Sequence, residues 1–182
     1  MWPEEIEWAV KQFNKFLPKT VKTCIDVGSE DEQYRTQLQP WNNFIYDYFS
    51  SKKIKINTMD LDPKKKPDYV HDITNPTNDI GKFDVVLATH LLEHVPILRL
   101  GDVAVNLEQL VAKKGYLLVS VPNSYPYHAR PIDNGWRPVT KELVKLFKGK
   151  ILASSTIEVE HNSLKYKNHP LNKASCALLR YD

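Results

Sequence analysis

Acidic and small polar residues follow four predicted strands of this chain, at the points where the strands end. In open α/β sheets, ligands bind beyond the carboxyl ends of the strands. A carboxylate at such an end can accept hydrogen bonds from both hydroxyls of a ribose, and a glycine lets the backbone approach a ligand without a Cβ in the way. An aspartate followed by an apolar residue could bond an adenine amino group and cover its ring. The segments are Asp26-Val27-Gly28-Ser29, Asp60-Leu61-Asp62, His71-Asp72-Ile73 and Thr89-His90.

Two of these aspartates also have a plainer interpretation. Asp60 could be an ordinary turn residue beside Asp62. Asp72, in the run Asp72-Ile73-Thr74-Asn75, could form an Asx turn or cap a helix.

Two histidines are candidates for acid–base work, because an unperturbed imidazole titrates near physiological pH. His94 comes shortly after a strand, and His128 lies in a proline-rich loop with Asp133 and Arg137. Loops over a rigid α/β scaffold commonly carry binding groups. We expect His94 and His128 to be catalytic. The alternatives are that His94 bonds a backbone carbonyl and that Asp133 and Arg137 pair with each other to fix the loop.

The segment His90-Leu91-Leu92-Glu93-His94 matches the H-x-x-E-H pattern of inverted zinc metalloproteases. Such a site needs both histidines on one face of a continuous helix, with a distant third ligand. Here a strand runs straight into the motif, and Pro96 follows it. With only Cys24 and Cys176, the chain also lacks a disulfide framework or a cysteine-based zinc site. We therefore expect no metal site, and we expect Cys24 to be buried and inert.

Apolar periodicity predicts alternating helices and strands. A helix from Ile6 to Leu17 should end before Pro18, and further helices should hold Trp41 to Phe49, Leu98 to Ala112, and Leu143 to Phe147 after an N-cap at Thr140. Trp41 and Trp136 should serve packing rather than substrate binding. The predicted strands are 21–27, 54–59, 69–73, 83–88, 116–121, 151–159 and 176–181.

This alternation predicts a Rossmann-like, doubly wound α/β sheet that is mostly parallel. The last two strands have no helix between them, so they should form an antiparallel hairpin at one edge. At 182 residues the chain fits one domain spanning 1–182.

Several motifs together resemble class I S-adenosylmethionine-dependent methyltransferases, and within them the type 11 domains. Phe83-Asp84-Val85-Val86 and Leu92-Glu93-His94-Val95 are similar to that group's FDVV and LEH segments. The run Tyr127 to Asp133, with Trp136-Arg137, resembles a loop in members that often accompany cell-surface glycan genes. The resemblance covers roughly residues 20 to 147. It implies S-adenosylmethionine as cofactor, with Asp60 on the ribose and Asp72 with Ile73 on the adenine. The cofactor contacts expected are Asp26, Gly28, Ser29, Asp60, Leu61, Asp72, Ile73, Thr89 and His90.

The first motif departs from the family pattern Asp-x-Gly-x-Gly-x-Gly. Asp26 and Gly28 match it, but Ser29-Glu30-Asp31-Glu32 follow. Three acids near the methionyl carboxylate of the cofactor would repel it, unless Glu30 or Asp31 pairs with the cofactor's amino group. The missing glycines also count against NAD and nucleotide phosphates.

We therefore expect methyl transfer from S-adenosylmethionine to a small polar or sugar-like acceptor. The rival hypothesis is a binding module or partner subunit that keeps the fold but has lost the cofactor. A net charge of +3 does not favour nucleic acid, and no apolar run is long enough to span a membrane. We expect a cytoplasmic protein.

Overall fold

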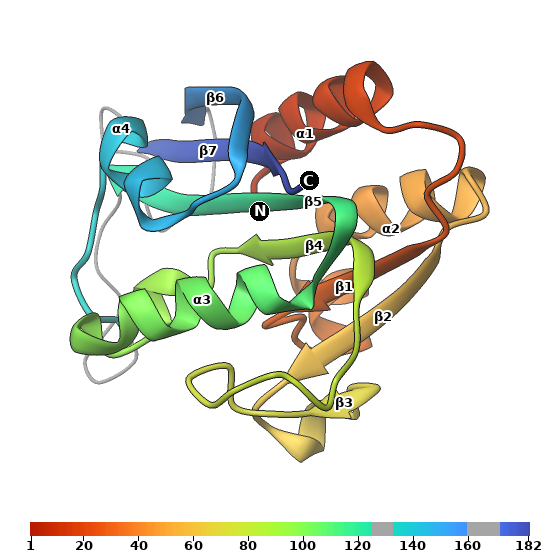
Figure 1. The fold of residues 1–182 in the computed structure, drawn as a ribbon, viewed down its shortest axis with the longest axis horizontal. Helices are drawn as coiled ribbons and strands as arrows, with labels where there is room; N and C mark the ends of the chain where they lie inside the picture. The colour runs from red at the N-terminus through yellow and green to blue at the C-terminus, as the bar shows by residue number, and fades with distance from the viewer. Residues whose placement is uncertain (125–132, 160–171) are drawn as a thin grey trace.

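The computed structural model of the chain describes residues 1–124, 133–159 and 172–182. Its centre is a sheet whose described strands have the order β3-β2-β1-β4-β5-β7-β6 (Figure 1). Strands β1 to β5 pair in parallel, and β7 is antiparallel to both β5 and β6. The predicted fold class, including the antiparallel C-terminal hairpin, is confirmed. The strands are β1 (Thr23–Val27), β2 (Lys55–Asp60), β3 (Tyr69–Val70), β4 (Phe83–Thr89), β5 (Val111–Ser124), β6 (Lys150–Val159) and β7 (Asn172–Arg180).

Helices cover both faces of the sheet. The α-helices are α1 (Pro3–Phe16), α2 (Asn43–Ser51), α3 (Leu100–Leu110) and α4 (Thr140–Leu143). Short turns of other helix types are η1 (Tyr34–Leu38), η2 (Pro40–Asn42), η3 (Pro63–Lys65), η4 (Leu92–His94), η5 (Ile97–Arg99) and η6 (Val144–Leu146). Within the described ranges, no helix has the length and apolar character needed to cross a membrane.

The apolar side chains divide into two main clusters, one on each face. Helices α1 and α2 pack on one face and α3 on the other (Figure 1). Strand β4 feeds both clusters, because successive side chains of a strand point to opposite faces. Val85 and Leu87 join the α1–α2 cluster, whereas Val86 and Ala88 join the α3 cluster. This double burial explains why β4 reads as a continuous apolar run.

The structure also settles smaller expectations. Cys24 is fully buried, and burial raises the pKa of its thiol, as an inert cysteine requires. The predicted cap at Thr140 is wrong by one residue. Val139 occupies the N-cap position, and its backbone N–H donates to Glu142 Oε2 at 3.1 Å. The Thr140 hydroxyl bonds Thr156 Oγ1 instead, at 2.9 Å.

Candidate functional site

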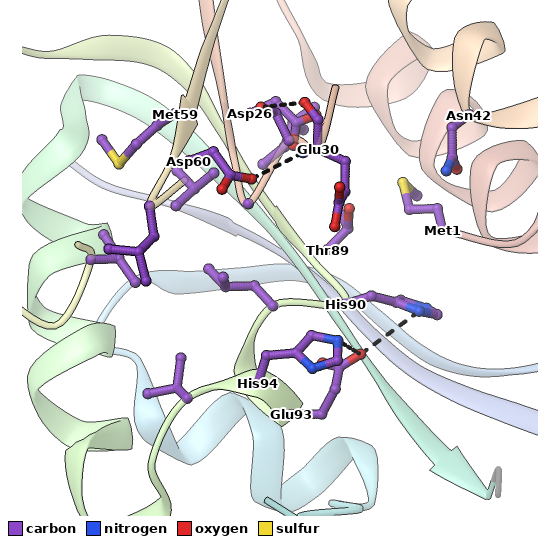
Figure 2. Close-up of a pocket in the computed structure, with 18 of the residues that line it drawn as sticks. Met1, Asp26, Glu30, Asn42, Met59, Asp60, Thr89, His90, Glu93 and His94 are labelled. Atoms are coloured by element: carbon purple, nitrogen blue, oxygen red, sulfur yellow. Dashed lines mark hydrogen bonds and ion pairs between the residues drawn. The ribbon is translucent and has the colours of Figure 1, made fainter. Parts of the chain in front are cut away.

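A cavity of about 570 Å³ lies at the carboxyl ends of β1, β2 and β4 (Figure 2). This volume is in the range of small-molecule sites. Every residue predicted to contact a cofactor lines it, and so does His94, whereas His128 lies outside the described residues. We call this space the strand-end cavity. The predicted residues in its wall are Asp26, Gly28, Ser29, Asp60, Leu61, Asp72, Ile73, Thr89, His90 and His94.

The turn after β1 requires glycine at position 28. Gly28 has a φ of +76°, a conformation that side-chain-bearing residues rarely adopt. A Cβ built there would lie 3.0 Å from Leu91 Cδ1. The backbone N–H groups of Gly28 and Ser29 donate to Met59 O at 2.8 and 3.2 Å. The turn therefore brings bare backbone to the edge of the cavity and ties it to β2.

The acids of the first loop do not all face the cavity. Glu30 lines it, with a φ of +56°, and its carboxylate forms an ion pair with Lys65. Asp31 Oδ1 accepts a hydrogen bond from Tyr34 N at 2.7 Å and so begins η1. Glu32 is exposed at the start of this helical segment. The repulsion expected from three acids is thus reduced to Glu30, whose charge is balanced by Lys65.

Arg35 holds the loop after β1 in place by hydrogen bonds to its backbone, a role that the sequence did not predict. Its Nη1 donates to the backbone oxygens of Ser29 and Glu30 at 2.8 and 2.7 Å. The guanidinium lies 4.8 Å from the centre of the Tyr46 ring. The Tyr46 hydroxyl in turn donates to Asp26 Oδ2 at 2.6 Å. This chain of contacts, which no local sequence motif signals, fixes the loop that lacks the family's later glycines.

Burial raises the pKa of Asp26, and the hydrogen bond from Tyr46 and the charge of Arg35 oppose that rise. Burial and the Asp26 charge raise the pKa of Tyr46, so its hydroxyl stays protonated and acts as the donor. The pair thus holds the end of β1 against α2.

Asp60 ends β2 and lines the cavity. Its Oδ1 accepts from Asp62 N at 2.9 Å and its Oδ2 accepts from Glu30 N at 3.2 Å (Figure 2). Each carboxylate oxygen has a second acceptor position. Asp60 can therefore accept two further hydrogen bonds while its own orientation stays fixed.

Asp72 and Ile73 lie in the turn after β3. Asp72 Oδ1 accepts from the backbone N and the hydroxyl of Thr74 at 2.9 and 2.8 Å, which is the Asx turn left open by the sequence. Asp72 Oδ2 has no hydrogen-bond partner among the described residues. Ile73 is buried, and its backbone oxygen accepts from Asn106 Nδ2 at 2.8 Å. The turn thus presents one unused carboxylate oxygen beside a fixed apolar side chain.

At the other end of the cavity, His90 meets the N-terminal helix. His90 Nε2 lies 2.9 Å from Glu5 Oε2. The Trp2 ring packs edge-on against the imidazole, with 4.6 Å between the ring centroids. Glu5 is fully buried and also accepts from Trp2 N at 2.7 Å. Burial alone would raise the pKa of Glu5, but the His90 contact and neighbouring donors lower it to about 2. Burial lowers the pKa of His90, so its neutral imidazole donates a hydrogen bond to the Glu5 carboxylate.

Glu93 is a second buried acid at this end of the cavity. The sequence predicted no role for it beyond its place in the LEH motif. Its side chain is 1% exposed. Oε1 lies 3.8 Å from His90 Nδ1 and 3.9 Å from His94 Nε2, and Figure 2 shows the carboxyl between the two rings. Oε2 has no hydrogen-bond partner among the described residues. Burial raises the pKa of Glu93 to about 8.

Residues 133–137 stabilise the η4 turn by hydrogen bonds to its backbone. Arg137 Nη2 pairs with Asp133 Oδ2 at 2.5 Å, so the expected alternative of a loop-fixing pair is what the structure shows. Asn134 Nδ2 donates to the backbone oxygens of Leu92 and Val95 at 2.7 and 2.6 Å. The ion pair and the amide together hold the turn that carries Glu93 and His94.

The remaining expectations concern packing and metals. Trp41 and Trp136 pack against the two core clusters, as predicted, and Trp41 Nε1 donates to Met1 O at 2.9 Å. In the parts of the chain that the structure describes, no group of three His, Cys, Asp or Glu side chains is arranged to hold a metal ion.

Comparisons with known proteins agree with this geometry. A family model described as a methyltransferase domain matches residues 4–154. No curated protein sequence matches the chain. Among solved structures, TehB from Haemophilus influenzae superposes with a TM-score of 0.64 at 16% identity, over 96% of this chain and 62% of TehB. The chain therefore spans less than two thirds of that protein.

Two further structures were solved with S-adenosylhomocysteine bound. The N-methyltransferase NodS from Bradyrhizobium japonicum has a TM-score of 0.56 at 10% identity, over 96% of this chain and 86% of NodS. The 1,6-didemethyltoxoflavin-N1-methyltransferase from Burkholderia thailandensis, which also holds 1,6-didemethyltoxoflavin, has a TM-score of 0.63 at 14% identity, over 97% of this chain and 78% of that enzyme.

Proposed function

Because the chain belongs to the family of methyltransferase domains and has the fold of class I S-adenosylmethionine-dependent enzymes, we propose that it methylates a small polar or sugar-like acceptor. The observation that carries the proposal is that all the residues expected from the motifs to hold a cofactor line one cavity. The methyl donor is S-adenosylmethionine, whose sulfonium supplies an activated methyl group.

The walls of the strand-end cavity fit this cofactor. Asp60 keeps two acceptor positions for the ribose hydroxyls. Asp72 Oδ2, which has no partner among the described residues, lies beside Ile73, where an adenine amino group and ring would lie. Gly28 brings backbone without a Cβ to the cavity wall. Asp26, Ser29, Leu61, Thr89 and His90 complete the proposed cofactor contacts.

The reaction mainly requires alignment, because the leaving group is already activated. Holding nucleophile, methyl carbon and sulfur in line can supply about 7 to 11 kcal/mol of barrier reduction. A base is needed when the nucleophile carries a proton. His94, 36% exposed in the cavity wall, is our candidate for that base. His128 is a second candidate on the strength of the sequence alone.

The size of the cavity supports a small acceptor, since about 570 Å³ must hold both substrates. The N-methyltransferase NodS and the didemethyltoxoflavin enzyme are similar in fold, and the second holds a small heterocyclic acceptor. A sugar-like acceptor is our proposal from the resemblance of residues 127–133 to a loop of glycan-associated enzymes.

Calorimetric titration of the purified chain with S-adenosylmethionine and S-adenosylhomocysteine tests the proposal. We expect micromolar binding of both. An absence of binding at millimolar ligand would contradict the proposal for this chain and favour the rival hypothesis of a partner subunit. The rival hypothesis depends on repulsion between the cofactor and the acids Glu30, Asp31 and Glu32. Of these three, only Glu30 lines the cavity, which weakens that hypothesis.

A further inference from the structure

Glu93 is a buried carboxyl without a full set of hydrogen-bond partners, at the end of the cavity opposite Asp60. It is 1% exposed, it lines the cavity, and its Oε2 is unpartnered among the described residues. Buried polar atoms in native proteins are nearly always paired, since leaving one unpaired is destabilising. An orphaned carboxyl oxygen in a binding cavity therefore points to a group that arrives with the substrate.

The surroundings of Glu93 favour proton exchange. His90, at the end of β4, and His94, on η4, place ring nitrogens 3.8 and 3.9 Å from Oε1. These distances are too long for hydrogen bonds but allow contact after a small side-chain rotation.

The other charged groups that act on Glu93 come from three places. Glu5 on α1 disfavours its ionisation, whereas Arg137 and the amino group of Met1 favour it. Arg137 is itself paired with Asp133. The balance leaves the carboxyl neutral at pH 7 in the free protein and close to its titration point at pH 8.

We propose that Glu93 is the final acceptor of the proton that the methylated atom loses, and that His94 carries the proton to it. This inference rests on the proposed function. The lone pair of an acceptor hydroxyl or amine forms the bond to the methyl carbon, and the carbon–sulfur bond breaks with its electron pair left on sulfur. The proton of the nucleophile moves to the His94 imidazole, and the imidazolium passes a proton to the ionised Glu93 carboxylate. In these terms His94 is the catalytic base, and Glu93 takes the proton from His94 without touching the acceptor.

The inference narrows the substrate class. The acceptor atom must carry a hydrogen, so it is a hydroxyl or an amine rather than a thioether or a tertiary amine. Because Glu93 must be ionised to take the proton, methyl transfer should increase with pH through about 8, where half of the Glu93 carboxyls are ionised, and level off above that pH.

The first experiment needs no acceptor. In the full chain saturated with S-adenosylhomocysteine, ¹³C NMR follows the Glu93 side-chain carboxyl and the His94 ring as pH is varied. We expect the His94 signal to show a second inflection where Glu93 titrates, and Glu93→Gln to remove it. Independent titration of the two groups would overturn the proposal, because a purely structural Glu93 would not couple to His94.

The second experiment measures transfer of labelled methyl from S-adenosylmethionine to a protein-free cell extract that serves as a mixture of acceptors. We expect Glu93→Gln to lower the rate about 100-fold or more, with S-adenosylhomocysteine binding unchanged and the pH dependence flattened. The exposed Glu7→Gln on α1 is the matched control. Acetylating the amines of the extract beforehand separates the two acceptor classes, since transfer then stops for an amine and continues for a hydroxyl.

The outcomes separate the two claims. A wild-type chain that transfers no methyl contradicts the proposed function. An active wild-type chain whose Glu93→Gln variant keeps its rate and pH profile contradicts only the role of Glu93. If Glu93→Gln fails to fold, His94→Gln, at a partly exposed position, interrupts the same step and must slow transfer.

Discussion

The two ends of the strand-end cavity are built in different ways. At one end, Asp60 and Asp72 accept hydrogen bonds from backbone groups of their own turns, Asp62 N and Thr74 N. At the other end, Glu5 and His90 are 85 residues apart in the chain and meet only in the folded protein, where the start of α1 reaches the residue that follows β4. The first end has carboxylates that keep open acceptor positions. The second has buried ionisable groups that set each other's charge.

This difference separates binding from proton transfer. Changes at the Asp60 end should weaken the cofactor complex with little effect on the pH dependence of the protein. Changes at the Glu5 end should alter stability and pH dependence and affect cofactor binding less, since only His90 there is a proposed cofactor contact.

The largest expected effect is on cofactor binding by Asp60→Ala. The variant loses two charge-assisted hydrogen bonds to the ribose, each worth about 1.5 to 3 kcal/mol, and it frees the backbone of Glu30. We expect the Kd for S-adenosylhomocysteine to rise by about two to four orders of magnitude in calorimetry. Asp62→Ala, two residues along, caps only the exposed η3 turn and is the matched control. Equal binding by Asp60→Ala and the wild type would remove Asp60 from the cofactor site.

The same division explains what the sequence could predict. Parallel strands joined by helices place their carboxyl ends on one edge, so reading the strand ends in order was enough to collect Asp26, Asp60, Asp72 and Thr89 in one cavity. The sheet order and the antiparallel hairpin follow from the same alternation. The match of residues 4–154 to a methyltransferase domain confirms the predicted enzyme class and its methyl donor. The roles of the individual site residues remain predictions.

Contacts between residues that are far apart in the chain could not be predicted from the sequence. Nothing near Glu5 or His90 in the sequence indicates that they touch, since α1 reads only as an amphipathic helix. Arg35 likewise sits in a polar run, and its contacts with Ser29 O and the Tyr46 ring depend on how η1 folds back. Burial of Glu93 was hidden because acids after a strand are usually exposed.

The second prediction concerns the Glu5–His90 pair. Because the His90 imidazole is neutral, Glu5→Gln leaves no unpaired charge, but it removes the carboxylate from a charge-assisted hydrogen bond worth about 1.5 to 3 kcal/mol. We expect the free energy of unfolding in urea at pH 7 to fall by about that amount, with S-adenosylhomocysteine binding within a few-fold of the wild type. Gln12→Glu, a charge change elsewhere on α1, should have little effect. A stable Glu5→Gln variant would show that the pair contributes nothing.

The pH dependence of stability has a definite sign for Glu5. Its pKa is depressed from 4.5 to about 2 in the folded chain, so the unfolded chain binds the proton more tightly. The stabilisation is therefore complete above about pH 4.5 and is lost as pH falls towards 2. Urea titrations of wild type and Glu5→Gln should converge over this window. Parallel curves would contradict the assignment.

The third prediction concerns the fastening of the first loop. Arg35→Gln removes the two hydrogen bonds to Ser29 O and Glu30 O and the contact with the Tyr46 ring. We expect cofactor binding to weaken about tenfold, since a net loss of about 1.4 kcal/mol corresponds to that factor. Gln37→Ala, exposed on the same η1 segment, is the control. If both variants bind equally well, another contact holds the loop.

The smallest expected effect is on stability, where glycine substitutions at two acids of the altered first motif should change the free energy of unfolding in opposite directions. Glu30 has a φ of +56°, where glycine is favoured, whereas Glu32 lies in the first turn of a helical segment. Glu30→Gly relieves backbone strain but loses the Lys65 ion pair and adds freedom to the unfolded chain, so we expect a gain of about 0.5 kcal/mol. Glu32→Gly places glycine in a helix and should lose about 0.5 to 1 kcal/mol. Thermal unfolding of the two variants measures the difference directly. A gain in cofactor affinity with Glu30→Gly alone would show that the Glu30 carboxylate, although paired with Lys65, still repels the cofactor, whereas unchanged affinity would mean that Lys65 neutralises it.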